Sequence, residues 1–290
     1  MASPARRLEC NVPGDFYVDS SCIDCGTCRW VAPETFGQAE EAAKVFAQPQ
    51  GDEQVAAALR ALVACPTASI GTTGDQDVEA AARAFPHPIA AGVYHCGYHS
   101  EDSFGAASYL ITRPGGNVLV DSPRFAAPLV RGIEALGGVD LMFLTHRDDV
   151  ADHERFAAHF GCERILHRDD VTEATRGVER QPEGVEPLAL ADDLLVIPVP
   201  GHTRGSACLL FDGRFLFSGD HVAWSRPLQR VHAFRRACWF DWETQIESMA
   251  RLAGYGFEHI LPGHGAPCRF PRTEMGEHMA ACVEWMREVT

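Results

Sequence analysis

Residues 145–153 are THRDDVADH, and they directly follow the apolar run LMFL of residues 141–144. Short apolar runs bounded by polar residues are typical of buried β-strands. This stretch therefore places imidazole and carboxylate groups where a predicted strand ends in a turn. Such groups can meet those of neighbouring strand ends at one point, which is what a metal site requires.

Three later segments have the same arrangement of a predicted strand followed by a histidine or an aspartate. They are Pro200-Gly201-His202-Thr203, Ser218-Gly219-Asp220 and Pro262-Gly263-His264-Gly265. The two strands expected before the first and second of these segments are residues 194–200 and 214–220, which are rich in branched and aromatic apolar residues. Four separated strand ends thus supply side chains able to bind metal.

The order of these four segments resembles that of the metallo-β-lactamase superfamily, over about residues 91–270. The resemblance implies an α+β fold, an αββα sandwich, with a site for two metal ions at one edge of its two sheets. Carried over residue by residue, it implies the metal ligands His146, Asp148, Asp152, His153, His202, Asp220 and His264. Asp220 is expected to bridge the metals, and the expected catalytic residues are Asp152, Asp220 and His221, the last as a group that orients a ligand or handles a proton.

The first segment departs from the family pattern H-x-H-x-D-H. Asp148 stands at the second histidine position, and two extra residues precede Asp152 and His153. If Asp148 coordinates, it shares one metal with His146 and His202, and the other metal belongs to Asp152, His153 and His264. If the insertion turns Asp148 away, Asp149 could replace it. Failing both, one metal site is weakened and the centre holds a single ion.

The exchange of an imidazole for a carboxylate has a chemical consequence. A hard oxygen donor shifts the preference of a site from zinc toward iron or manganese, although zinc still competes. Members of the superfamily with a carboxylate at this place include its diiron branch, such as the flavodiiron oxygen and nitric-oxide reductases. Iron is therefore the expected metal, with zinc and manganese as alternatives.

Four of the eleven cysteines lie in a spaced set near the N-terminus. Cys22, Cys25 and Cys28 form C-x2-C-x2-C, and Cys65 stands directly before Pro66. Three thiolates this close can bind one face of an iron–sulfur cubane, and a remote fourth can complete it. A structural zinc site, the alternative, usually pairs two C-x2-C hooks. The pattern resembles a single-cluster bacterial-type ferredoxin over about residues 10–70 and implies a [4Fe-4S] cluster.

The chain is expected to comprise a small ferredoxin-like domain at residues 1–72, a linker at 73–90 and a metallo-β-lactamase-like domain at 91–290. Apolar periodicity and turn residues predict the following elements: helices at 52–63, 126–136, 151–160, 242–253 and 272–289, and a hairpin of 107–113 with 117–122. The other histidines, His95 and His99 among them, are expected to be ordinary polar side chains. The other seven cysteines are expected to be buried small hydrophobic residues.

Charge and composition restrict the partners. The 290 residues contain 25 basic and 40 acidic ones, a formal net charge of −15, which disfavours nucleic acid and anionic membranes. The sequence has no apolar run of membrane-spanning length and no apolar leader, so a cytoplasmic location is expected. A small-molecule substrate and an external electron-donor protein are the expected partners.

Two hypotheses for the function follow. The first is a metal-dependent oxidoreductase, in which the cluster passes electrons from an external donor to a nonhaem, expected diiron, centre that activates oxygen or reduces a small substrate. The fusion of the two domains supports this hypothesis, because a covalent link keeps the electron donor at high effective concentration. The second is a dinuclear zinc hydrolase of an ester, thioester or lactam with a structural or redox-sensing cluster, since hydrolysis is the commonest chemistry of the superfamily. A redox-gated binding protein is a third, non-enzymatic alternative.

Overall fold

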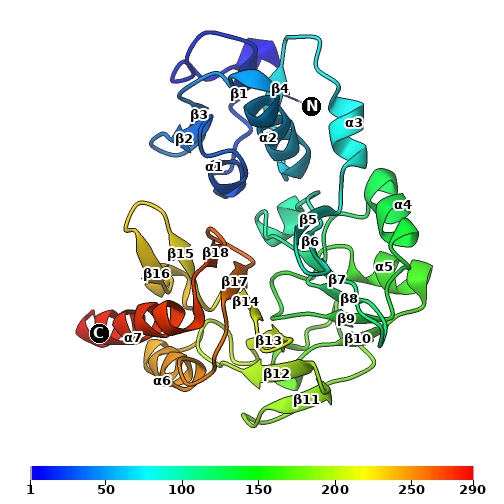
Figure 1. Ribbon diagram of the computed structural model, residues 1–290, viewed down its shortest axis with the longest axis vertical. Helices are drawn as coiled ribbons and strands as arrows, with labels where there is room; N and C mark the ends of the chain where they lie inside the picture. The colour runs from blue at the N-terminus through cyan, green and yellow to red at the C-terminus, as the bar shows by residue number, and fades with distance from the viewer. Residues whose placement is uncertain (1, 290) are drawn as a thin grey trace. The chain divides into compact units, whose positions relative to one another are not determined.

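The structure is a computed structural model that describes residues 2–289. Its contacts divide the chain into two units. Among the described residues, one unit consists of residues 2–139 with Ala151–Phe160, and the other of Asp140–Val150 with residues 161–289. Figure 1 labels the helices and strands of both units.

The first part of unit 1 has two small antiparallel strand pairs and two helices. The pairs are β1 (Phe16–Val18) with β4 (Ile70–Thr72), and β2 (Phe36–Gln38) with β3 (Ala43–Val45). The short 3-10 helix η1 (Pro4–Arg6) precedes them, and the helices are α1 (Thr27–Val31) and α2 (Gly51–Ala64). A buried apolar cluster that includes Phe16, Phe36 and Leu59 joins these elements. The helix predicted at 52–63 is therefore confirmed, and its first turn carries Asp52 and Glu53, which suits the positive end of the helix dipole.

The second part of unit 1 is a set of four antiparallel strands. They are β5 (His87–Ala90), β6 (Val93–His95), β7 (Tyr109–Ile111) and β8 (Val118–Val120), each paired with the next. The predicted hairpin is present as β7 and β8. The other elements of this part are α3 (Val78–Arg83), η2 (Glu101–Ser103), α4 (Ala127–Ala135) and α5 (His153–Phe160). The stretch predicted as a linker, 73–90, thus contains a helix and a strand, and the strand belongs to the sheet. The predicted domain limits themselves stay a prediction.

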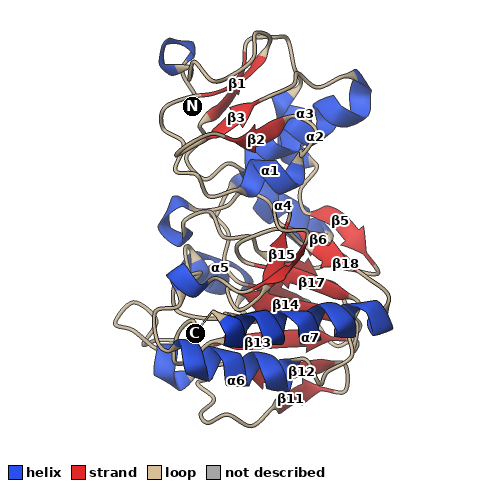
Figure 2. Ribbon diagram, turned by 90° about the vertical axis from the view of Figure 1, so that its left-hand side faces the viewer, coloured by secondary structure: helices blue, strands red, loops and turns tan. Residues whose placement is uncertain are grey.

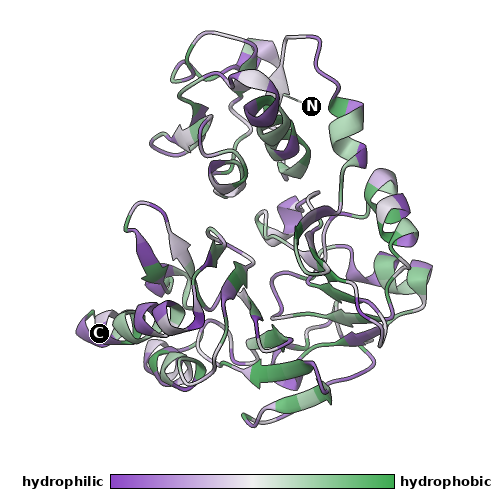
Figure 3. Ribbon diagram, viewed as in Figure 1, coloured by the Kyte–Doolittle hydropathy of each residue, from purple (hydrophilic) through white to green (hydrophobic). Residues whose placement is uncertain are grey.

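Unit 2 is built on a six-stranded sheet in the order β11-β12-β13-β14-β17-β18. These strands are β11 (Leu188–Ala191), β12 (Leu194–Pro198), β13 (Ala207–Phe211), β14 (Phe215–Gly219), β17 (His259–Pro262) and β18 (Cys268–Arg269). All five residues of both β13 and β14 are buried, which explains the apolar sequences of β13 and of residues 215–217 (Figure 3). β14 and β17 are parallel, and the other neighbours are antiparallel.

Two long helices cover one face of this sheet. α6 (Trp242–Leu252) and α7 (Arg272–Glu288) lie side by side across it (Figure 2). Their buried side chains, including Met249 and Met279, share one apolar cluster with Leu210 and Leu216 of the strands. The remaining elements of unit 2 are the parallel pair β9 (Leu141–Phe143) and β10 (Glu163–Ile165), the hairpin β15 (Ala223–Ser225) and β16 (Arg230–His232), and the 3-10 helices η3 (Arg168–Asp170) and η4 (Arg235–Ala237). The predicted helices at 242–253 and 272–289 are confirmed to within one residue.

The expectation for the cysteines outside the cluster motif is partly wrong. Cys96, Cys162, Cys208 and Cys282 are buried, but Cys10 is exposed, and Cys238 and Cys268 are half-buried. Cys10 lies in a turn near the N-terminus and is not among the residues of the apolar cluster of this part. Within residues 2–289, no helix is both long and apolar enough to span a membrane.

Candidate metal centre and iron–sulfur site

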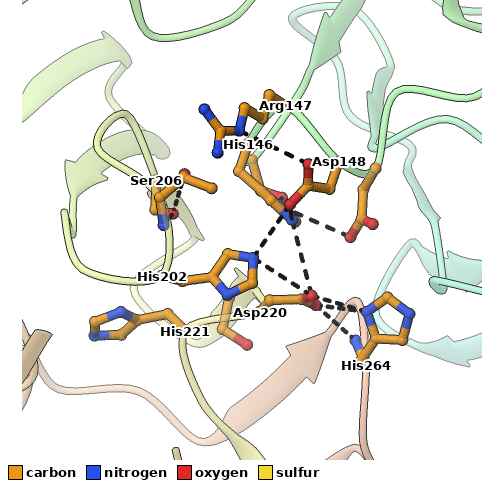
Figure 4. Close-up of polar contacts among 12 residues, drawn as sticks. His146, Arg147, Asp148, His202, Ser206, Asp220, His221 and His264 are labelled. Atoms are coloured by element: carbon orange, nitrogen blue, oxygen red, sulfur yellow. Dashed lines mark hydrogen bonds and ion pairs between the residues drawn. The ribbon is translucent and has the colours of Figure 1, made fainter. Parts of the chain in front are cut away.

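Four loops of unit 2 bring polar side chains to one place. His146 follows β9, His202 follows β12, Asp220 follows β14 and His264 follows β17. Figure 4 shows these side chains directed toward one another. The strand-end placement predicted from the sequence therefore produces a real cluster of possible ligand atoms.

The first group of ligand atoms consists of His146, Asp148 and His202. Asp148 Oδ2 lies 3.6 Å from His202 Nε2 and 3.9 Å from His146 Nε2. The three ligand atoms lie within 4.8 Å of one another, a spacing that a shared metal ion can bridge. His146 and His202 are buried, whereas the Asp148 side chain is 45% exposed, so this group has an opening to solvent.

The second group consists of His146, Asp149 and Asp220. Asp149 Oδ2 lies 3.9 Å from His146 Nδ1, and Asp220 Oδ2 lies 3.8 Å from His146 Nε2. His264 joins this group through its Nδ1, 2.8 Å from Asp220 Oδ1. Asp148 and Asp149 were predicted as alternatives, but the structure places both beside His146.

Several buried nitrogen atoms of the site have no hydrogen-bond partner among residues 2–289. They are Nε2 of His146, both ring nitrogens of His202 and both ring nitrogens of His221. A buried polar atom without a partner costs free energy, and such atoms are rare in native proteins. Because the nitrogens of His146 and His202 stand beside carboxylate oxygens, the donor set fits a bound metal cation. His221 is outside both ligand groups, and its predicted catalytic role stays a prediction.

The protonation states suit metal binding. Burial lowers the pKa of His146 to about 4, although the charge of Asp220 opposes the change. Burial by itself would raise the pKa of Asp220, but the charge and hydrogen bond of His264, with His146 and His202, hold it below its usual range. Burial also lowers the pKa of His221 to about 3. Neutral imidazoles and ionised carboxylates are the forms that coordinate metals.

Asp170 supports the site, and the sequence patterns did not reveal it. This buried carboxylate accepts hydrogen bonds from Arg147 N at 3.1 Å, Thr203 Oγ1 at 2.5 Å and Gly205 N at 2.8 Å. It thereby ties the loop of His146 to the loop of His202. The sequence offers one weak signal, since Asp170 comes shortly after the strand β10 as the ligands follow theirs.

A glycine is also required at the site. A Cβ atom on Gly263 would lie 2.5 Å from Asp149 Oδ2 and 2.9 Å from Asp220 Oδ1. Only a residue without a side chain allows the β17 loop to approach both carboxylates so closely.

Asp152 and His153 have other surroundings, in unit 1. Asp152 Oδ2 accepts a hydrogen bond from Phe125 N at 2.7 Å, and Asp152 Oδ1 lies 3.4 Å from Arg155 Nη1. His153 is buried as the first residue of α5. Neither is part of the ligand groups formed among residues 2–289. Their predicted ligand and catalytic roles stay predictions.

The four cysteines of the N-terminal motif line one cavity in unit 1. Backbone amides face two of the sulfurs, with Ala43 N 3.4 Å from Cys22 Sγ and Ser69 N 3.2 Å from Cys65 Sγ. No cysteine in the described chain forms a disulfide. Burial, together with the neighbouring thiols Cys25 and Cys65, raises the pKa of Cys28. Four converging thiols with amide donors fit an iron–sulfur cluster, because bound iron deprotonates its thiol ligands.

Comparison with known sequences finds one family match and several partial relatives. Residues 18–72 match the family described as "4Fe-4S single cluster domain of Ferredoxin I". The chain is 34% identical over 116 residues to a hydroxyacylglutathione hydrolase of Xanthomonas campestris, which covers 38% of this chain and 44% of that one. It is 36% identical over 86 residues to a probable metallo-hydrolase of Bacillus subtilis, which covers 26% and 33%. The chain thus spans less than half the length of these relatives.

Comparison with solved structures concerns the rest of the chain. A metallo-β-lactamase from Pontibacter korlensis has a TM-score of 0.50 at 17% identity, and the match covers 68% of this chain and 97% of that one. ETHE1 from Myxococcus xanthus has a TM-score of 0.48 at 15% identity, with 68% and 91% covered. The protein therefore joins a single-cluster 4Fe-4S ferredoxin domain to a domain with the α+β sandwich fold of the metallo-β-lactamases.

Proposed function

We propose that the protein is a metal-dependent oxidoreductase whose 4Fe-4S domain supplies electrons to a nonhaem centre of two metal ions, with iron as the metal. The ligands of that centre are drawn from His146, Asp148, Asp149, Asp152, His153, His202, Asp220 and His264. One observation carries the proposal: three carboxylates, those of Asp148, Asp149 and Asp220, stand beside the imidazole of His146, and the imidazole of His202 belongs to the same cluster.

The donor set favours iron for a chemical reason. Carboxylate oxygens are harder donors than imidazole nitrogens, and a mixed set of imidazoles and carboxylates suits nonhaem iron. A bound metal pair of this kind supplies Lewis-acid and one-electron chemistry. The 4Fe-4S domain on the same chain adds a group that stores one electron.

The protein's own residues define where a substrate reaches the centre. Asp148 is 45% exposed, and the ring of Trp239, which is 60% exposed, lies 6.2 Å from that of His202. Trp239 N also donates a hydrogen bond to the carbonyl oxygen of His202 at 2.9 Å, which holds the backbone of residue 239 beside this ligand. An exposed aromatic ring next to polar ligands suits a small molecule with an apolar part.

A dinuclear zinc hydrolase is the second candidate. It is favoured by the sequence similarity to a hydroxyacylglutathione hydrolase. On this alternative the substrate is a thioester such as an acylated glutathione, and the cluster is structural or redox-sensing.

Metal analysis of anaerobically purified protein tests the proposal. We expect the wild type to contain more iron than the four atoms of the cluster. In the Asp148→His variant, we expect zinc to replace this extra iron. Asp169→His, which alters an exposed aspartate outside both ligand groups, is the matched control and should keep the wild-type metals. Two zinc ions per chain, with thioester hydrolysis that does not change when the cluster is reduced, would overturn the proposal in favour of the hydrolase.

A further inference from the structure

A line of buried side chains in unit 1 connects a cluster cysteine with two histidines outside the cluster motif. Cys25 Sγ lies 3.4 Å from Thr27 Oγ1, and Thr27 Oγ1 lies 3.1 Å from His99 Nδ1. His99 Nε2 in turn lies 2.7 Å from His95 Nε2. Thr27, His95 and His99 are at most 5% exposed, so solvent does not compete for these contacts.

The carbonyl group of Gly105 determines where the proton on His99 lies. His99 Nδ1 is 2.7 Å from Gly105 O, and a carbonyl oxygen can only accept a hydrogen bond. Nδ1 of His99 therefore carries a proton, whether the ring is neutral or charged. The same N–H is also within reach of Thr27 Oγ1.

This arrangement directs the hydroxyl group of Thr27. The hydroxyl has two possible acceptors, Gly105 O at 3.2 Å and Cys25 Sγ at 3.4 Å. His99 already donates to Gly105 O, and its N–H faces a lone pair of Thr27 Oγ1. Gly105 O could accept from both groups, but the bond from His99 weakens it as a competitor for the hydroxyl proton. Cys25 Sγ is an anionic thiolate when it binds the cluster, so it is the stronger acceptor and takes the hydroxyl proton.

We propose that His99 is a positioning residue for the iron–sulfur cluster: through Thr27 it keeps a hydrogen bond on Cys25 Sγ and so raises the reduction potential of the cluster. A hydrogen bond to a cluster sulfur stabilises the additional negative charge of the reduced state. The inference depends on the 4Fe-4S assignment and not on the proposed reaction at the second centre.

The packing around the histidines keeps this network in place. The ring of Trp30, which belongs to α1, lies 4.9 Å from that of His95. A Cβ on Gly105 would lie 2.9 Å from Cys25 Sγ, so the backbone at residue 105 reaches the cysteine itself. Burial holds the pKa of His95 well below its usual value. A neutral His95 can donate from Nε2 to His99, which fixes the orientation of the His99 ring.

The test is a potentiometric titration of the full chain with dithionite and mediators, followed by electron paramagnetic resonance of the reduced cluster. Thr27→Val, which removes the hydroxyl, should lower the ratio of reduced to oxidised cluster about tenfold at a fixed potential, ~59 mV for a one-electron couple. Thr27→Ser keeps the hydroxyl and should keep the wild-type potential.

His99→Phe frees Gly105 O to attract the Thr27 hydroxyl, so the reduction potential of the cluster should also fall in this variant. The double variant should fall no further than Thr27→Val, because both changes remove one hydrogen bond. His87→Phe is the matched control, since it removes a histidine opposite His95 in the β5–β6 pair, and should leave the potential unchanged.

Analysis of iron and acid-labile sulfide checks that each variant carries a complete cluster before its potential is compared. An unchanged potential in Thr27→Val, or additive shifts in the double variant, would overturn the inference. If His99→Phe does not assemble the cluster, the pair Thr27→Val and Thr27→Ser decides the question. No substrate turnover is measured, so a failure of the proposed oxidoreductase activity cannot be confused with a failure here.

Discussion

Replacement of Asp170 by asparagine should weaken both the fold and the metal centre. One carboxylate oxygen accepts from Gly205 N, and the other accepts from Arg147 N and Thr203 Oγ1. An amide retains one oxygen. The best orientation of the asparagine keeps the hydrogen bonds from Arg147 N and Thr203 Oγ1 at this oxygen and turns the NH2 group toward the N–H of Gly205, which then has no acceptor.

The loss is therefore one hydrogen bond to a charged group, worth about 2 kcal/mol. For a chain of 290 residues, this loss lowers the midpoint of thermal unfolding by about 3 °C. The loops of His146 and His202 also lose part of their connection, and such supporting changes typically reduce metal affinity about 10–100-fold.

Two measurements check these values. Thermal unfolding of the chelated protein gives the stability change, and competition with a chromophoric chelator gives the metal affinity. Asp169→Asn, at an exposed neighbour, should change stability by less than about 0.5 kcal/mol. If Asp170→Asn lost stability but bound metal as tightly as the wild type, the argument that this carboxylate aligns the two ligand loops would be refuted.

Three further outcomes follow from the structure. Gly263→Ala should lower the metal content measured by elemental analysis, because its methyl group would displace the carboxylates of Asp149 and Asp220; unchanged metal content would contradict the close approach. Removal of metal by a chelator should lower the unfolding midpoint of the wild type, and addition of metal should restore it, since a ligand that binds the native state stabilises that state. The hydrogen bonds of Arg164 lower the pKa of Glu179 to about 2 from 4.5, so the pair stabilises the fold above about pH 4.5 and loses this effect as the pH falls through 2. Glu179→Gln should therefore cost about 1 kcal/mol at pH 7, a small value because Glu179 is 45% exposed, and nothing near pH 2 in denaturant unfolding; an equal cost at both values would contradict the assignment.

Local patterns predicted much of the secondary structure. The helix α2, the hairpin of β7 and β8 and the helix α7 follow from apolar periodicity and turn residues, which act over a few neighbours. The same patterns suggested a linker at 73–90, because the strand β5 is half polar and only its pairing with β6 makes it a strand. Tertiary pairing of this kind cannot be seen in a short window of sequence.

The candidate metal site was predicted in its residue types but not in its arrangement. The sequence left Asp148 and Asp149 as alternatives, because the conformation of the loop after β9 depends on loops remote in the chain. Asp170 and His99 were missed for the same reason. His99 contacts Thr27 across 72 residues, and nothing in the sequence around a lone histidine indicates such a contact.

The hydrogen bonds of Thr27 to residues 99 and 105 have a consequence for protein engineering. The segment that matches the ferredoxin family ends at residue 72, well before either partner. An excised fragment limited to that segment would carry every thiol but lack part of the environment that tunes them. We therefore expect its reduction potential to differ from that of the intact chain.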